Sequence, residues 1–85
     1  MFYVYVLKSK KDLNLYIGYT SDLRKRLKEH NEGKNLSTRN RFPFRLVYYE
    51  AYESKKDAMV RELKLKKFKN SYTELKKRLP NSLMS

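Results

Sequence analysis

Strand-like and helix-like segments follow one another along the chain, separated by short polar connections. Residues 2–7 (FYVYVL) are aromatic or β-branched almost throughout, which is typical of a β-strand. Residues 15–19 (LYIGY) resume this character after the mostly polar KSKKDLN, so we expect a β-hairpin over residues 2–19. Residues 45–52 (RLVYYEAY) predict a third strand.

A helix is expected over residues 22–31 (DLRKRLKEHN), directly after the hairpin. The Thr-Ser-Asp at its start can cap the free N–H groups, and we expect the helix to end near Gly33. At about 100° per residue, Leu23, Leu27 and His30 fall within roughly 60° of one another and form the inward face.

Two later segments each carry a serine three residues before an acid, the pattern of a capping box. They predict one helix over residues 55–68, capped by Ser54, and a shorter one over residues 71–79, capped by Ser71 and ended by Pro80.

The element order β-β-α-β-α-α indicates an α+β fold, with a small, largely antiparallel three-stranded sheet flanked by helices. A chain of 85 residues is large enough for one modest core and too small for two. Hydrophobic residues make up 40% of the chain and charged residues 35%, which suits a folded domain better than a disordered tail. We expect a single domain over residues 1–85.

Charge is the strongest feature of the composition. Lysine and arginine total 21 against nine acids, a net charge of +12 at pH 7. This excess favours a polyanionic partner, either nucleic acid or an anionic membrane surface. The chain lacks tryptophan, and its tyrosines cluster in the strand-like segments, whereas surface-bound helices carry a bulky apolar face. Nucleic acid is therefore favoured.

The lack of cysteine and of a long apolar segment limits the kinds of site and the cellular location that we expect. There is no cysteine, which excludes disulfides and thiolate metal sites and is compatible with the cytoplasm. The apolar run at the N-terminus is too short to span a bilayer, and its basic residues follow it, the wrong order for a signal peptide. We expect no membrane association.

His30 is the only histidine of the chain, and Arg26 lies one helical turn before it. A lone histidine at the edge of an apolar face is usually a hydrogen-bonded core residue, with such an arginine a surface cation. Two further features favour a functional interpretation. The first is that Tyr16 precedes Ile-Gly, where Gly18 at the end of a strand lets a phosphate or another backbone approach closely.

Glu62 is the second unusual position. Helical spacing places it between apolar residues on both sides, where a carboxylate is costly unless it is paired or holds a metal. One interpretation is an ion pair with a nearby cation. The other is a single ligand to a hard divalent ion, since Mg²⁺ is often held by one or two carboxylates together with waters and phosphate.

The ordered set of these residues resembles the GIY-YIG nuclease superfamily. It comprises Tyr3-Val4-Tyr5, Tyr16-Ile17-Gly18 about ten residues later, Arg26 and His30 four apart, and Glu62 on a later helix. The resemblance covers roughly residues 2–68 and is closest to small stand-alone bacterial members, related to the N-terminal nuclease domain of the excision-repair incision subunit. Tyr3 and Val4 replace the glycine and isoleucine of the first motif, while its functional tyrosine is kept as Tyr5.

The resemblance implies hydrolysis of a phosphodiester with one divalent ion, Mg²⁺ or Mn²⁺, and assigns catalytic roles to five residues. Glu62 would hold the ion, and Arg26 would hold the scissile phosphate. Tyr5 would act as general base or orient the attacking water, and cationic neighbours would lower its pKa from about 10. His30 would accept or relay the proton. Tyr16 would hydrogen-bond the phosphate or the water.

The loop between the first helix and the third strand is long and basic. We expect it to follow a nucleic-acid backbone, although a solvated loop without a partner is equally consistent with its sequence. The candidate nucleic-acid contacts in this loop are Lys34, Thr38, Arg39 and Arg41, and Gly18 is a further candidate outside it. The family often has a further polar residue late in the domain, and Asn70 is the nearby candidate.

The sequence as a whole predicts a DNA endonuclease of low sequence specificity, structure-selective and connected to repair by its resemblance. Specificity would be poor or supplied by a protein partner, because no base-reading element is apparent. The alternative is a nucleic-acid-binding module with this fold that cuts little. A third option, docking to an acidic protein, would differ from both in weak DNA binding at all salt concentrations.

Overall fold

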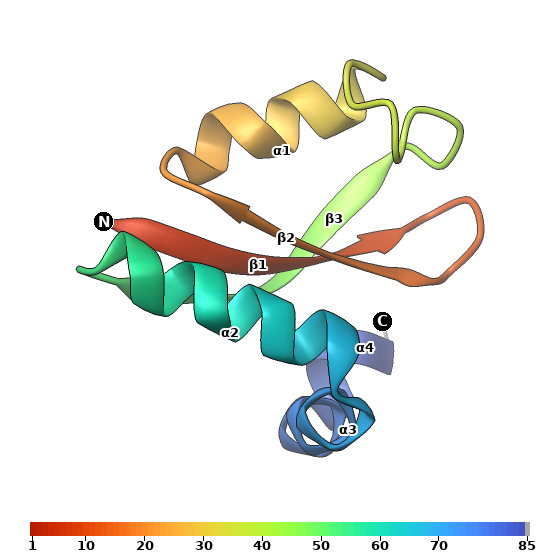
Figure 1. Ribbon diagram of the computed structural model, residues 1–85. Coiled ribbons are helices and arrows are strands. Elements are labelled where there is room, and N and C mark those ends of the chain that lie inside the picture. Colours follow the sequence, from red (N-terminus) through yellow and green to blue (C-terminus); the bar gives the residue numbers. More distant parts are fainter. Residues whose placement is uncertain (85) are drawn as a thin grey trace.

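The computed structural model describes residues 1–84, and three strands form one antiparallel sheet at its centre (Figure 1). The strands are β1 (Phe2–Ser9), β2 (Leu15–Thr20) and β3 (Phe44–Tyr52). Their order is β2-β1-β3, and β1 pairs antiparallel with both neighbours. The predicted hairpin and third strand are thus confirmed, each within two residues of the expected ends.

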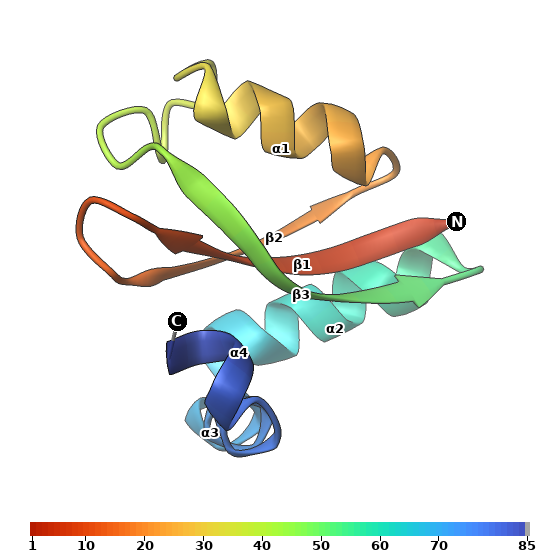
Figure 2. The same cartoon turned by 180° about the vertical axis from the view of Figure 1, so that it is seen from behind.

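Helices cover both faces of the sheet. α1 (Leu23–Asn31) lies on one face, and α2 (Lys55–Lys67), α3 (Lys69–Arg78) and the short α4 (Pro80–Met84) lie on the other (Figures 1 and 2). The predicted α+β class is confirmed. Pro80 does end the preceding helix as expected, but it also starts α4, which the sequence analysis did not predict.

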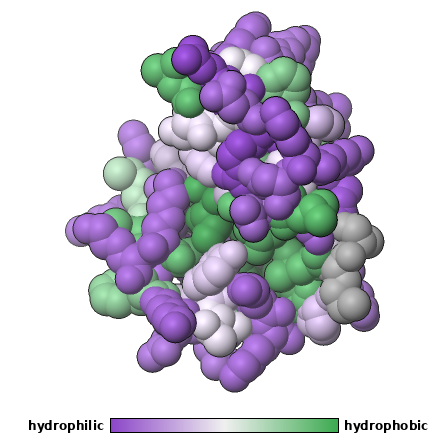
Figure 3. All heavy atoms as spheres, turned by 90° about the vertical axis from the view of Figure 1, so that its right-hand side faces the viewer, coloured by the Kyte–Doolittle hydropathy of each residue, from purple (hydrophilic) through white to green (hydrophobic). Residues whose placement is uncertain are grey.

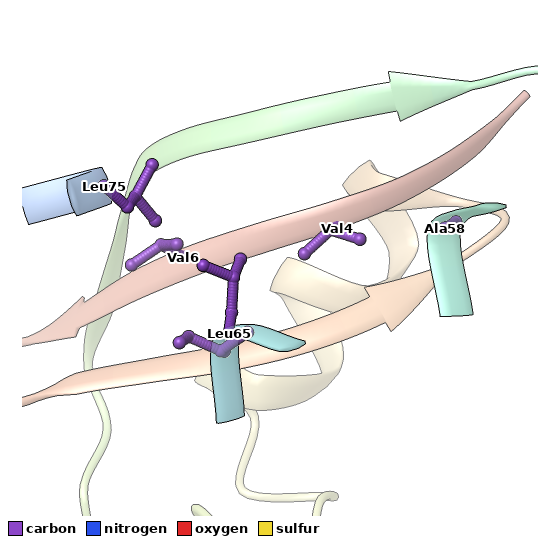
Figure 4. Close-up of a cluster of buried hydrophobic side chains, with 6 residues drawn as sticks. Val4, Val6, Ala58, Leu65 and Leu75 are labelled. Atoms are coloured by element: carbon purple, nitrogen blue, oxygen red, sulfur yellow. The ribbon is translucent and has the colours of Figure 1, made fainter. Parts of the chain in front are cut away.

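The alternation of side chains along β1 divides the interior into two clusters. Val4 and Val6 point toward α2 and α3 and pack with Ala58, Leu65 and Leu75 (Figure 4). The next residues along the strand point to the opposite face, because successive side chains alternate. There Tyr5 and Leu7 pack with Phe44 beneath α1. One strand therefore supplies both the main core and the face that carries the candidate site.

Helix caps follow the sequence in two of three places. The Asp22 carboxylate accepts from the backbone N–H of Lys25, and Ser54 Oγ accepts from that of Asp57. The expected Ser71 cap is wrong, because α3 begins at Lys69 and has no side-chain cap. A single extended residue, Phe68, separates α2 from α3. α3 therefore starts before Ser71.

A polar cluster ties β3 to α2. Glu50 accepts hydrogen bonds from Arg61 Nε and Nη2 at 2.8 and 3.0 Å, and from the hydroxyl of Tyr48 at 2.6 Å. The hydroxyl of Tyr52 is a further donor. Burial acts against the charge of Glu50, but these donors outweigh it and hold the pKa of that carboxyl below its usual value. The strand and the helix are thereby fixed relative to each other.

Hydrophilic side chains cover most of the surface seen in Figure 3, with hydrophobic side chains visible in a band across its middle. No helix within residues 1–84 has the length and apolar character needed to cross a membrane.

Candidate active site

A chain of three hydrogen-bonding side chains crosses from the sheet to the loop after α1. Tyr5 Oη lies 2.9 Å from Nε2 of His30, and Nδ1 of the same ring lies 2.7 Å from Oγ1 of Thr38. His30 and Thr38 are fully buried, and Tyr5 is 2% exposed. The strand supplies Tyr5, α1 supplies His30, and the loop supplies Thr38, so three segments meet at one imidazole.

Gly18 makes room for Tyr5. The two residues face each other in the β1–β2 register, and a Cβ at Gly18 would lie 2.2 Å from Tyr5 Oη and 2.3 Å from its Cζ. Real Cβ atoms do not approach other atoms so closely, so the Tyr5 ring occupies the space that any other residue would fill. Gly18 is also buried. Tyr5 makes the close approach that Gly18 permits, and the expected contact of Gly18 with nucleic acid stays a prediction.

Aromatic rings surround His30. Tyr16 lies edge-on to the imidazole with centroids 5.1 Å apart, and Phe44 does so at 5.8 Å. Burial is the main reason that the pKa of His30 falls below its ordinary value, and the charge of Arg26 acts in the same direction. The lowered pKa of His30 favours the neutral imidazole at pH 7, which has one N–H and one acceptor nitrogen.

Arg26 stands one turn before His30 at the border of the site. Its Nη1 lies 3.4 Å from Glu29 Oε1, and 40% of its side chain is exposed. Its Nε is buried and has no hydrogen-bond partner in the described part of the chain. A partly exposed guanidinium suits a phosphate, whose oxygens accept two parallel hydrogen bonds.

The protonation state of Tyr5 differs from the expectation. Burial is the largest cause, with the neighbouring Tyr16 second, in raising the pKa of Tyr5 to about 12. Arg26 acts in the opposite direction but does not prevail, and the carboxylate of Glu62 adds a further increase. The expected lowering by cations is thus wrong for the structure as it stands, because desolvation of the phenolate outweighs one nearby guanidinium.

Glu62 reaches the same region from α2, across the edge strand β2. Its side chain is 24% exposed and lies 3.1 Å from Nζ of Lys66, one turn further along the helix. That ammonium group also stands over the ring of Tyr16, 5.7 Å from its centroid. Within residues 1–84 no three Asp, Glu, His or Cys side chains come together as a metal cluster. Glu62 is therefore a carboxylate outside any such cluster, paired at present with a lysine.

Comparison with known proteins identifies the family of this chain. Residues 1–78 match the family model of the GIY-YIG catalytic domain. The chain belongs to the GIY-YIG family. This family is one of nucleases, which implies a nucleic-acid substrate.

Relatives of this GIY-YIG chain are small proteins as well. It is 50% identical over 68 residues to UPF0213 protein CPE1444 of Clostridium perfringens, covering 79% of this chain and 72% of that protein. It is 49% identical over 74 residues to UPF0213 protein SpyM50708 of Streptococcus pyogenes, covering 86% and 79%. The solution NMR structure of UPF0213 protein BH0048 from Bacillus halodurans is 39% identical, with a TM-score of 0.59 over 100% of this chain and 95% of that one.

The basic loop of this GIY-YIG domain divides into structural and exposed positions. Thr38 is fully buried against His30, and its expected contact with a nucleic-acid backbone stays a prediction. Arg41 lies 2.6 Å from the carboxylate of Asp12, and this ion pair closes the loop onto the β1–β2 turn. Lys34 and Arg39 are exposed and stay candidates for phosphate contacts.

A surface cavity connects Lys34 with the site. Its volume is about 340 Å³, and its lining includes Arg26, Glu29 and Lys34. A second cavity of about 370 Å³ is lined in part by Lys25, Arg26 and Glu29. Arg26 and Glu29 thus line both cavities.

Asn70 lies exposed in the first turn of α3. That helix packs against α2, in the layer opposite α1, and nothing in the structure links Asn70 to the His30 cluster. Sequence reasoning also missed two residues of the cluster, Phe44 beside His30 and Lys66 beside Glu62. Their residue types are common in strands and basic helices, so no local pattern marks them.

Proposed function

We propose that this protein is a divalent-metal-dependent endonuclease that hydrolyses DNA phosphodiester bonds with low sequence specificity. The observation that carries the proposal is the convergence of Tyr5, Arg26 and His30, with Tyr16 and Glu62 beside them. These are the residues that match the family's motifs, and they come from two strands and two helices. A module that only binds nucleic acid needs cations and stacking aromatics, not a buried tyrosine bonded to a histidine.

In this proposal the substrate phosphate would lie beside Arg26. The guanidinium of Arg26, whose side chain is 40% exposed, would donate to a phosphate oxygen, and its fixed positive charge would stabilise the additional negative charge of the transition state. Tyr5, whose charge state responds to Arg26, would orient the attacking water or accept its proton. Tyr16, against the same imidazole, would hold the phosphate or the water in line.

One divalent ion, Mg²⁺ or Mn²⁺, fits the single carboxylate of Glu62. Its donor is a hard oxygen, its only partner among the described residues is Lys66, and water and phosphate oxygens can complete the coordination of such an ion. When bound, the ion would neutralise charge on the phosphate and the leaving oxygen, and would offset the carboxylate charge that helps to raise the pKa of Tyr5. Lys66 would then release Glu62.

Low sequence specificity follows from the kind of contacts available. Lys34, Arg39 and Arg26 supply charge and N–H donors, which position a phosphate backbone without reading bases. Selection of the substrate would then depend on the shape of the DNA, such as a branch or flap, or on a protein partner. A connection with repair is proposed on kinship alone.

The test is cleavage of supercoiled plasmid and of a branched oligonucleotide, with Mg²⁺, with Mn²⁺ and with chelator. Wild type is compared with Glu62→Gln and with the matched control Glu74→Gln, an exposed carboxylate on α3. We expect nicking that needs the metal, persists in Glu74→Gln and falls at least about 100-fold in Glu62→Gln, the scale of losing a principal electrostatic contribution.

Calorimetric titration with Mn²⁺ adds a readout independent of turnover. Weaker heat of binding in Glu62→Gln than in Glu74→Gln would support Glu62 as the ligand. Equal nicking by all three proteins would reject the assignment of the site. Salt-sensitive DNA binding without cleavage by any of them would favour the alternative, a binding module.

A further inference from the structure

Thr38 has an unusual environment for a loop residue. It lies eight positions after His30, in a loop rich in exposed polar residues, yet it is 0% exposed. Its backbone N–H donates to Asn35, and its carbonyl accepts from the N–H of Arg41. Two backbone hydrogen bonds therefore hold the residue in a turn that directs its side chain inward, beneath the basic part of the loop.

The hydroxyl of Thr38 has one polar partner among the described residues. That partner is Nδ1 of His30, at 2.7 Å. A hydroxyl has one proton to donate, and a donor buried without an acceptor is costly. If the imidazole donated from Nδ1, the Thr38 proton would have no acceptor. If the hydroxyl donates, its only proton is used.

The hydrogen bond on the other side of the imidazole, to Tyr5, is compatible with donation from Thr38 to Nδ1. With Nδ1 as the acceptor, a neutral imidazole carries its proton on Nε2, which lies 2.9 Å from Tyr5 Oη. The hydroxyl proton of Tyr5 then needs a different acceptor, and Tyr5 keeps 2% exposure where Thr38 has none. Unlike Thr38, Tyr5 stands beside Arg26, where the proposed function places a phosphate oxygen and the attacking water.

We infer that Thr38 is a positioning residue that donates its hydroxyl proton to Nδ1 of His30 and so holds this histidine as the Nε2–H tautomer, a donor to Tyr5. The catalytic meaning of this inference rests on the proposed function. His30 would then donate a hydrogen bond to the oxygen of Tyr5, in place of accepting or relaying its proton as the resemblance implied.

The experiment uses the fact that the chain has a single histidine. In protein labelled with ¹⁵N, long-range ¹H–¹⁵N correlation at neutral pH shows one imidazole, and its protonated and unprotonated nitrogens differ widely in chemical shift. We expect Nε2 to be protonated and Nδ1 to be unprotonated in the wild type. Protonation on Nδ1 in the wild type would overturn the inference without need of any variant.

Two variants test the part played by Thr38. Thr38→Val keeps the shape of the side chain and removes the hydroxyl, and Thr38→Ser keeps the hydroxyl. We expect the ¹⁵N chemical shift of Nδ1 to change in Thr38→Val, because this nitrogen loses its hydrogen-bond donor, and to stay close to the wild-type value in Thr38→Ser. A Thr38→Val spectrum identical to that of the wild type would overturn the inference.

Plasmid nicking separates this inference from the proposed function. If both hold, Thr38→Val cuts more slowly, and Thr38→Ser restores the rate and its pH profile. A wild-type rate in Thr38→Val despite a changed Nδ1 chemical shift would reject the positioning role. Absence of metal-dependent nicking in the wild type would reject the proposed function, whereas the tautomer assignment is judged by the nitrogen shifts alone.

Discussion

At the residue scale, the site depends on the absence of one side chain. Tyr5 is a bulky residue in the central strand, and its phenol ring extends over the residue opposite it in β2, which is Gly18. Its hydroxyl can reach His30 only because that position has no Cβ. The glycine of the Tyr-Ile-Gly motif is thus explained by packing within the protein, before any substrate is considered.

Gly18→Ala should therefore damage both stability and the site. The added Cβ would lie 2.2 Å from Tyr5 Oη, so the ring must move away from His30, and overpacking of this kind costs about 1–3 kcal/mol. Urea unfolding measures the loss of stability. The Tyr5→Leu background is the control, because leucine has no atoms at the position of the clash. An equal cost of Gly18→Ala in both backgrounds would contradict the explanation.

His30 should make stability depend on pH. Its pKa in the folded protein lies below the ordinary 6.5, owing first to burial and then to Arg26, with Glu29 acting in the other direction; Tyr5 and Tyr16 also face the ring. The unfolded chain thus binds a proton at higher pH than the folded one. The free energy of unfolding should fall as pH drops below about 6.5, by at most about 1.4 kcal/mol per unit.

Urea unfolding between pH 5 and 7.5 measures this dependence. No other side chain of ordinary pKa titrates in this range, so the slope reports His30. The matched variant is His30→Gln, which keeps a polar side chain at the position and has no titratable ring. A slope that persists unchanged in this variant would show that another group is responsible.

At the scale of elements, two serines with the same local pattern have different roles. Ser54 and Ser71 each precede an acid by three residues, but only Ser54 accepts from the N–H three residues later. Ser71 is already inside α3, which begins at Lys69. A capping box is a local pattern, and it does not indicate whether the preceding chain has already entered the helix.

Ser54→Ala and Ser71→Ala form a matched pair for this point. Loss of a cap costs typically about 1 kcal/mol, whereas a half-buried serine within a helix has no cap to lose. We expect the free energy of unfolding to fall by about 1 kcal/mol in Ser54→Ala and by less than half of that in Ser71→Ala. Urea denaturation of both variants measures it, and equal losses would show that Ser71 also supports a helix start.

The same limit explains which features could be predicted from the sequence. Strands, the first two helices and the family residues depend on spacing along the chain, and these predictions agree with the fold. The buried position of Thr38 and the raised pKa of Tyr5 depend on contacts between distant segments. No pattern within the loop distinguishes Thr38 from its exposed neighbours, and no count of lysines predicts that burial outweighs them at Tyr5.

At the scale of the whole molecule, positive charge far exceeds what the ion pairs use. The chain has 21 lysines and arginines, and within residues 1–84 six ion pairs are present. Some of these cations have a structural role, because Arg41 pairs with Asp12 and Arg61 pairs with Glu50. The remainder give the protein a positive field that would attract DNA from any direction.

The orientation of bound DNA can be found from the salt dependence of binding. Each phosphate that a cation neutralises in duplex DNA contributes about −0.9 to the slope of log K against log salt. Lys34 shares a surface cavity with Arg26, whereas Lys77 lies on α3, in the layer opposite α1. DNA that crosses the candidate site should therefore contact Lys34 and not Lys77.

Lys34→Gln should reduce the magnitude of the slope by about one unit, and Lys77→Gln should leave it unchanged, although both remove one positive charge. Fluorescence anisotropy with a labelled duplex between 50 and 200 mM salt measures both slopes. Equal reductions would mean that net charge alone attracts DNA, without a preferred face. A reduction in Lys77→Gln alone would place the DNA on the α3 side, away from Arg26 and His30, and would contradict the proposed site.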